Sequence, residues 1–126
     1  MPIFALEKIE AVKGNQDFYK LFIDGNCEFD DFEEEAKVNY RSEINSVYTY
    51  MELVAKLITV SPRKFKDITP KKENVKEYEF KTKHLRIYAI KEPGGKLVIC
   101  GGYKNTQPRD IRHFREVKKQ YLKSKD

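Results

Sequence analysis

Hydrophobic and polar residues follow two different periods along this chain, and the change of period divides the chain into segments. Residues 3–12 (IFALEKIEAV) and 17–23 (DFYKLFI) are rich in β-branched and aromatic residues, and the turn-forming group KGNQ separates them. Strands joined by such a turn form a hairpin. The pattern therefore predicts an N-terminal strand or hairpin within residues 1–30.

Apolar residues then recur every three or four positions between residues 31 and 60, which is the period of an amphipathic helix. The stripe consists of Phe32, Ala36, Tyr40, Ile44, Val47, Met51, Val54 and Ile58. Two aspartates just before it can cap the helix, and the glutamates that follow favour its N-terminal dipole. Ser61-Pro62 is expected to stop it, since the residue before a proline avoids the α region. We predict one long helix, or two helices broken near Asn39–Ser46.

The second half of the chain changes to short runs with the alternation of strands. Residues 61–74 contain two prolines and little periodicity, which predicts a loop. The strand-like runs are 75–81, 85–91 and 96–103. Glycines between the last two favour a hairpin, so an antiparallel meander is predicted over residues 75–103. Pro108 can occupy the first position of a C-terminal helix over residues 108–124.

Alternation along the middle run assigns its side chains to two faces of the sheet. One face receives Leu85, Ile87 and Ala89, and the other receives Arg86, Tyr88 and Ile90. Arg86 is therefore expected on a different face from the purely apolar set.

Length and composition fit one folded domain covering residues 1–126. The hydrophobic fraction is 40% and the aromatic fraction is 13%, which is not the composition of a disordered chain. The predicted class is α+β, with the helical region packed on an antiparallel sheet.

No apolar run approaches the ~20 residues that span a bilayer, and the first ten residues lack the apolar core of a secretory signal. The sequence thus predicts a cytoplasmic protein without a membrane partner.

The net charge of +5 hides a strong asymmetry between the two parts of the chain. Residues 1–60 hold 6 Lys+Arg and 12 Asp+Glu, a net charge of −6, whereas residues 61–126 hold 19 and 8, a net charge of +11. Such asymmetry is typical of proteins that bind nucleic acid. Lysine-rich surfaces also simply keep proteins soluble, and composition alone favours neither interpretation.

The sequence lacks the common motifs for binding metals and cofactors. Cys27, Cys100, His84 and His113 form no pair at metal-ligand spacing, which predicts reduced thiols and no metal. The P-loop, dinucleotide-binding, zinc-protease and nucleophile-elbow patterns are absent, and no cofactor is expected. The acidic run at residues 30–35 lacks the spacing of a calcium loop and is interpreted as a helix start.

Cationic and aromatic residues gather instead at the ends of the predicted meander strands. They are Lys81, Lys83, His84, Arg86, Tyr103 and Lys104. Fixed cations stabilise the dianionic phosphorus that forms when a ribose 2′-OH cleaves its own phosphodiester, and His, Tyr or Lys can move the protons. Tyr103 or Tyr88 can stack on an unpaired base. Each residue alone is more often solvated or packed, but together they predict a phosphate-binding face.

The stretch LRIYAIKEPGGKLVICGGYKNTQPRDIRHF resembles the RelE/ParE superfamily of toxins, particularly its HigB-like branch. The order of helix pair, basic linker, meander and C-terminal helix agrees with that family. The matching positions are Arg86, Gly102, Tyr103, Lys104, Thr106, Gln107 and Pro108. The resemblance implies the toxin of a type II toxin–antitoxin pair, a ribosome-dependent and metal-independent endoribonuclease acting on mRNA. It also implies a cognate antitoxin, expected to be a helix-turn-helix protein.

The resemblance also suggests roles for individual residues. The candidate catalytic residues are Arg86, as the phosphate-binding arginine, and Lys104, Tyr103 and His84. The candidate RNA contacts are Lys81, Lys83, Arg109 and Arg112. The chain departs from the family pattern at Glu77 and Glu79, which lie on a strand where cations are common. A non-enzymatic member of the fold, either a ParE-like gyrase inhibitor or an RNA-binding module, is the alternative.

Overall fold

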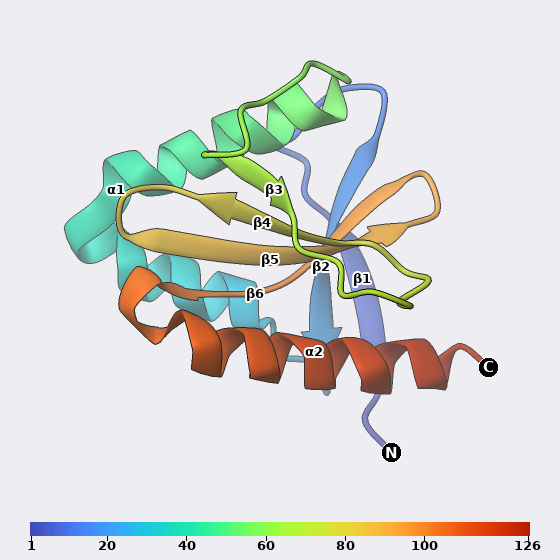
Figure 1. The fold of residues 1–126 in the computed structure, drawn as a ribbon. Coiled ribbons are helices and arrows are strands. Elements are labelled where there is room, and N and C mark those ends of the chain that lie inside the picture. Colours follow the sequence, from blue (N-terminus) through green and yellow to red (C-terminus); the bar gives the residue numbers. More distant parts are fainter.

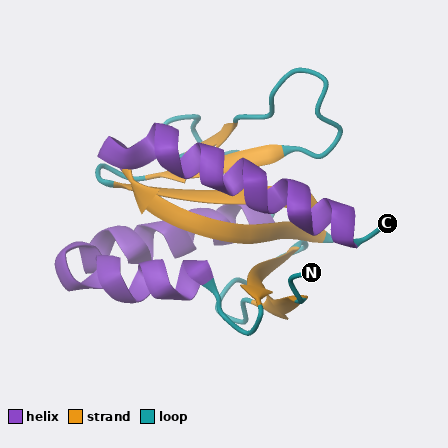
Figure 2. Cartoon of the chain, turned by 90° about the horizontal axis from the view of Figure 1, so that it is seen from below, coloured by secondary structure: helices purple, strands orange, loops and turns teal.

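The computed structural model describes all 126 residues as a six-stranded mixed sheet with one helix on each face (Figures 1 and 2). The strands lie in the order β1-β2-β6-β5-β4-β3. The elements are β1 Phe4–Lys8, β2 Asp17–Ile23, α1 Glu28–Ala55, β3 Phe65–Asp67, β4 Glu77–Lys81, β5 Leu85–Glu92, β6 Gly95–Tyr103, a 3₁₀ turn (η1) Lys104–Thr106, and α2 Gln107–Ser124. The predicted α+β class is confirmed. Neither helix has the length and apolar character needed to cross a membrane.

The pairing of the strands agrees with the prediction except at one junction. β1 and β2 form the predicted hairpin, and β4, β5 and β6 form the predicted antiparallel meander. β2, however, pairs with β6 in parallel, so the expectation of a purely antiparallel sheet is wrong. Local turns dictate antiparallel neighbours, but β2 and β6 are joined only through α1 and the whole meander, so no turn fixes their relative direction.

The helix α1 is shifted and kinked relative to the predicted segment 31–60. It begins at Glu28, and its N-cap residue, Cys27, makes no side-chain cap, so the predicted aspartate cap is wrong. It ends at Ala55, before Ser61-Pro62, because Leu57 adopts a left-handed conformation with φ of 62° and closes the last turn. At Tyr40 the backbone leaves helical geometry (φ −132°, ψ 37°). The kink therefore lies within the predicted break.

The predicted loop 61–74 contains a short edge strand, β3. Phe65 pairs with Phe80 of β4, and the two rings pack with centroids 4.7 Å apart. Three residues with a single apolar side chain carry no readable alternation, so the prediction of an unstructured loop is wrong here.

The central strand β5 is buried on both of its faces. Leu85, Ile87 and Ala89 belong to the core beneath α1, whereas Tyr88 and Ile90 belong to a second core beneath α2. The predicted alternation is confirmed, but both faces are buried over residues 85–90. Because the two helices cover opposite faces, their charges are also separated. α1 carries eight acidic and two basic residues, and α2 carries six basic and two acidic residues.

A buried ionic cluster joins α2 to the start of β4 and to the loop that precedes it. Lys118 is 2% exposed and donates to Glu77 Oε2 at 2.8 Å, to Glu73 Oε1 at 2.9 Å and to the Val75 carbonyl at 2.8 Å. Arg115 Nε donates to the other oxygen of Glu77 at 2.9 Å. The buried Glu77, 1% exposed, is therefore explained by its two ion pairs with Arg115 and Lys118 of α2.

Gly95 allows the close approach of β2 and β6. A Cβ added to Gly95 would lie 1.7 Å from the carbonyl oxygen of Asp17, its partner in the parallel pairing. We expect Gly95→Ala to lower the free energy of unfolding by roughly 2–3 kcal/mol, the upper part of the usual range for overpacking, in a urea titration.

Gly94→Ala is the matched control for this prediction. Gly94 has φ of +81° and open space around its Cβ position, so an alanine there meets only backbone strain of about 1 kcal/mol. An equal or smaller loss for Gly95→Ala would mean that β2 moves away at little cost.

Candidate functional site

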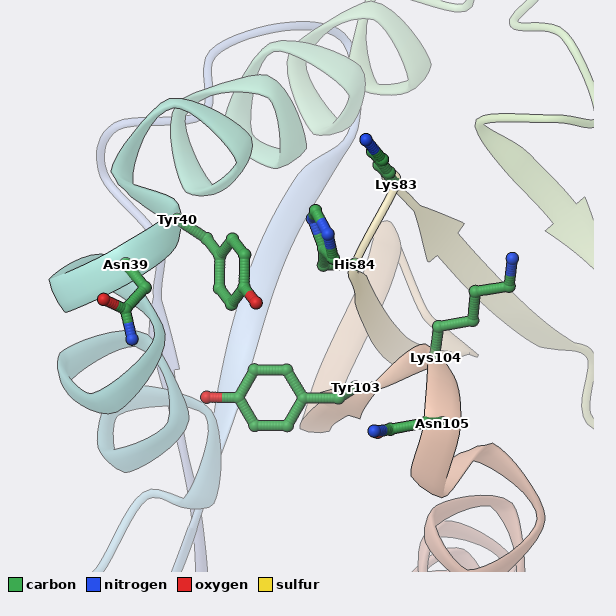
Figure 3. A pocket seen from close by; sticks show the side chains of 7 residues that line it. All are labelled: Asn39, Tyr40, Lys83, His84, Tyr103, Lys104 and Asn105. Atoms are coloured by element: carbon green, nitrogen blue, oxygen red, sulfur yellow. The ribbon is translucent and has the colours of Figure 1, made fainter.

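A pocket of about 580 Å³ lies between the kink of α1, the turn that joins β4 to β5, and the end of β6 (Figure 3). The residues that line it are Asn39, Tyr40, Lys83, His84, Tyr103, Lys104 and Asn105. Four of them were predicted from the sequence, namely Lys83, His84, Tyr103 and Lys104. The fold brings these four together from two segments about 20 residues apart in the chain.

Backbone hydrogen bonds fix the two segments against each other. The Lys104 amide donates to the carbonyl oxygen of His84 at 2.9 Å, which joins the end of β6 to the turn before β5. Thr106 then donates from its hydroxyl to Asp110 Oδ2 at 2.6 Å, at the start of α2. The Thr106 hydroxyl also lies 3.2 Å from the Tyr103 carbonyl oxygen, so the backbone of Tyr103 and Lys104 contacts both the turn before β5 and the start of α2.

His84 is held from two sides by residues of α1. Its ring stacks on Tyr40, with centroids 4.5 Å apart and planes at 27°. Its Nδ1 lies 2.6 Å from Glu43 Oε2. The other carboxylate oxygen, Oε1, accepts from the Thr82 hydroxyl at 2.5 Å and from the His84 amide at 2.8 Å. The His84 side chain remains 41% exposed, so the ring is oriented but accessible.

The carboxylate of Glu43 is stabilised in its charged form. Burial alone would raise its pKa, but the hydrogen bonds from Thr82 and His84 outweigh that effect, and the net result is a pKa below its usual value. Glu43 is therefore a carboxylate, and an acceptor only, at neutral pH.

Tyr103 is engaged through its hydroxyl and its ring. The hydroxyl donates to Glu35 Oε2 at 2.6 Å, and the ring packs edge-on against Phe32 at 5.1 Å. Burial, and then the hydrogen bond and charge of Glu35, raise the pKa of Tyr103 to about 12. Tyr103 consequently stays protonated at neutral pH and is placed to pack or stack, not to accept a proton.

Arg86 lies beneath the turn and does not line the pocket. It is 7% exposed, and its Nη1 donates to the carbonyl oxygens of Thr82 at 2.6 Å and Leu85 at 2.8 Å. Its buried Nε has no hydrogen-bond partner. Tyr88, the other predicted stacking residue, is fully buried and cannot receive a base.

The remaining predicted RNA contacts lie outside the pocket. Lys81 is the last residue of β4 and does not line the pocket. Arg109 and Arg112 are exposed on α2, and Arg109 borders a smaller hollow of about 260 Å³ with Gly102 and Asp110. Of the four predicted RNA contacts, only Lys83 belongs to the pocket.

Comparison with known proteins finds no match. No protein-family model, no curated protein and no solved structure matches this chain. No group of three or more His, Cys, Asp or Glu side chains gathers as a metal site, and Cys27 and Cys100 are free and buried.

Sequence reasoning missed the residues that α1 contributes to the pocket. Tyr40, which lines the pocket, is only a core position of the helix stripe in the sequence. Glu43 bonds His84 without lining the pocket, and nothing in the sequence singles it out. The only available signal was the position of Tyr40 and Glu43 near the predicted break of the helix, which gives no information about a partner 41 residues away. With them, the pocket holds an oriented imidazole beside two exposed lysines, an arrangement that can move a proton next to a bound phosphate.

Proposed function

We propose that this chain is an endoribonuclease of the RelE/HigB type, the toxin of a type II toxin–antitoxin pair, which cleaves mRNA on the ribosome without a metal ion. One observation carries the proposal. His84, bonded through Nδ1 to Glu43 and stacked on Tyr40, faces a pocket that also holds Lys83 and Lys104. These are the parts that ribose-assisted cleavage of a phosphodiester needs.

The reaction uses the substrate's own 2′-OH as the nucleophile. Its oxygen attacks phosphorus, the bond from phosphorus to the 5′ oxygen breaks, and the products are a 2′,3′-cyclic phosphate and a free 5′-OH. His84 Nε2 accepts the 2′-OH proton, and Glu43 stabilises the resulting imidazolium. The ammonium groups of Lys83 and Lys104 balance the charge on the phosphoryl oxygens. The departing 5′ oxygen takes a proton from one of these ammonium groups or from solvent.

The charge distribution supports a large polyanionic substrate. The second part of the chain carries a net charge of +11, and Arg109 and Arg112 extend the cationic surface along α2 beyond the pocket. Contacts of this kind add affinity for RNA without specifying a sequence. The cytoplasmic ribosome is the proposed place of action, and a helix-turn-helix antitoxin is the proposed partner that holds the enzyme inactive.

Cleavage of ribosome-bound mRNA tests the proposal directly. Purified protein is incubated with programmed ribosomes, in the magnesium that ribosomes require, and the mRNA ends are mapped. We expect cuts that leave a cyclic phosphate or a 3′-phosphate, because the 2′-OH is the nucleophile. An mRNA with 2′-deoxyribose at the cut site should resist cleavage at that site and remain cleavable at others.

A supercoiling assay with the same protein preparation separates the alternatives. Intact mRNA together with gyrase-dependent DNA breaks would overturn the ribonuclease proposal in favour of a gyrase inhibitor. Intact mRNA with intact supercoiling, from a folded protein free of antitoxin, would leave an RNA-binding module as the better description. Cleavage that persists on the 2′-deoxy substrate would contradict the mechanism.

A further inference from the structure

We infer that Glu43 and Arg86 are positioning residues which hold the turn of residues 82–85 from opposite sides, so that His84 exchanges its proton only through Nε2. The inference rests on the proposed function for its catalytic consequence. Its structural content, the tautomer of His84, can be measured without any RNA. It gives Arg86 a different role from direct phosphate binding.

Glu43 determines which nitrogen of His84 carries the hydrogen. A carboxylate only accepts hydrogen bonds, so the 2.6 Å contact between Nδ1 and Oε2 requires the hydrogen on Nδ1. In the neutral imidazole the lone pair is then on Nε2. No group of the protein bonds Nε2, whereas the ring face is covered by Tyr40. The one free polar atom of the ring is therefore the atom that can accept a proton.

Glu43 also fixes the backbone that carries the ring. Its second oxygen accepts from the Thr82 hydroxyl and from the His84 amide. The Thr82 hydroxyl oxygen in turn accepts from the Leu85 amide at 3.1 Å. One carboxylate thus joins α1 to the whole turn, and it does so from the kinked segment of the helix near Tyr40.

Arg86 holds the same turn from the other face of the sheet. Its Nη1 donates to the carbonyl oxygens of Thr82 and Leu85, the two ends of the turn. Only Nη1 makes these bonds, and the buried Nε has no partner. Because 7% of the residue is exposed and it does not line the pocket, the guanidinium lies out of contact with a phosphate bound there. Loss of Arg86 would therefore act on catalysis through the position of His84, and not through a lost phosphate contact.

The second histidine of the chain provides an internal reference. His113 lies with Nε2 at 2.7 Å from Glu28 Oε1, so its neutral ring is expected as the opposite tautomer. The chain has only two histidines, and their ¹⁵N imidazole resonances can be told apart by His113→Gln. Two carboxylate-bonded rings with opposite protonation make the prediction specific.

The test is ¹⁵N NMR of the imidazoles at a pH where both rings are neutral. We expect His84 with its hydrogen on Nδ1 and His113 with its hydrogen on Nε2. In Glu43→Gln the side-chain oxygen should keep the Thr82 and His84 donors, which turns the amide NH2 toward Nδ1. His84 should then shift toward the tautomer with its hydrogen on Nε2, while His113 is unchanged. Glu52→Gln, on the same helix and away from the turn, is the matched control and should change neither ring.

Kinetics supply the second readout. If the protein cleaves mRNA, Glu43→Gln should lower kcat by roughly 10²-fold with KM nearly unchanged, and Arg86→Lys should lower kcat with KM nearly unchanged. A wild-type His84 with its hydrogen on Nε2, or an unchanged tautomer in a folded Glu43→Gln, overturns the inference. An effect of Arg86→Lys on KM alone overturns the positioning role of Arg86.

If wild-type protein does not cleave RNA but shows the expected tautomers, the proposed function fails while the role of Glu43 in orienting the ring stands.

Discussion

Under the proposed ribonuclease mechanism, replacing His84 with alanine is expected to lower the rate of mRNA cleavage by roughly 10²–10⁴-fold, the contribution of a positioned general acid or base. The fold should persist, because the side chain is 41% exposed and its main packing partner is the ring of Tyr40. Single-turnover cleavage on programmed ribosomes measures the chemical step apart from product release. A far-UV circular dichroism spectrum of the same preparation checks the fold.

His113→Ala is the matched control for this experiment. His113 also pairs with a glutamate of α1, but it lies on α2 and does not line the pocket. Its loss should leave the cleavage rate within a factor of a few of the wild-type rate. If the two alanine variants cleave equally well, His84 is not the proton acceptor and the chemistry belongs to another group of the pocket.

The largest effect on stability is expected from Lys118→Met. The substitution removes the ammonium that binds Glu77 and leaves that carboxylate, 1% exposed, with only Arg115 as an ionic partner. Breaking a buried pair from one side typically costs about 3–5 kcal/mol when the remaining charge is left uncompensated. We expect the lower part of that range, because Arg115 still pairs with Glu77. A urea titration followed by circular dichroism should show the midpoint shift.

Two further variants separate the buried pair from general effects of the substitution. Lys119→Met changes the exposed neighbouring lysine and should stay within about 0.5 kcal/mol of wild type. The double variant Glu77→Leu with Lys118→Met removes both charges and should recover much of the loss. A double variant less stable than Lys118→Met alone would show that the ionic contacts of Glu77, including that to Arg115, hold α2 in place.

The elements of this fold could be predicted from sequence because most of them depend on local patterns. The apolar stripe of α1, the alternation along β5 and the glycine turn before β6 each leave a period or a composition that can be read directly. β3 was missed since three residues show no period. The C-terminal end of α1 was predicted too late in the chain. The left-handed conformation of Leu57 ends the helix at Ala55, before Ser61-Pro62 is reached.

Contacts between distant segments could not be predicted in the same way. The parallel pairing of β2 with β6 depends on how the chain returns after α1, and no local pattern in the two strands records that path. Glu43 is invisible for a similar reason. Its bond to His84 crosses 41 positions, and a single glutamate near the kink of a helix looks like any solvated residue. Arg86 was assigned to the correct face, but its burial follows from the docking of α2 over that face.

The placement of α1 and α2 on opposite faces makes the molecule an electric dipole, with an acidic side and a basic side. In the field of a polyanion such a dipole experiences a torque as well as an attraction. With a Debye length of about 8 Å at physiological ionic strength, the torque acts only during the last part of the approach. An encounter with a polyanion should therefore begin with α2 turned toward its charges, so that orientation is partly decided before any side chain of the pocket makes contact.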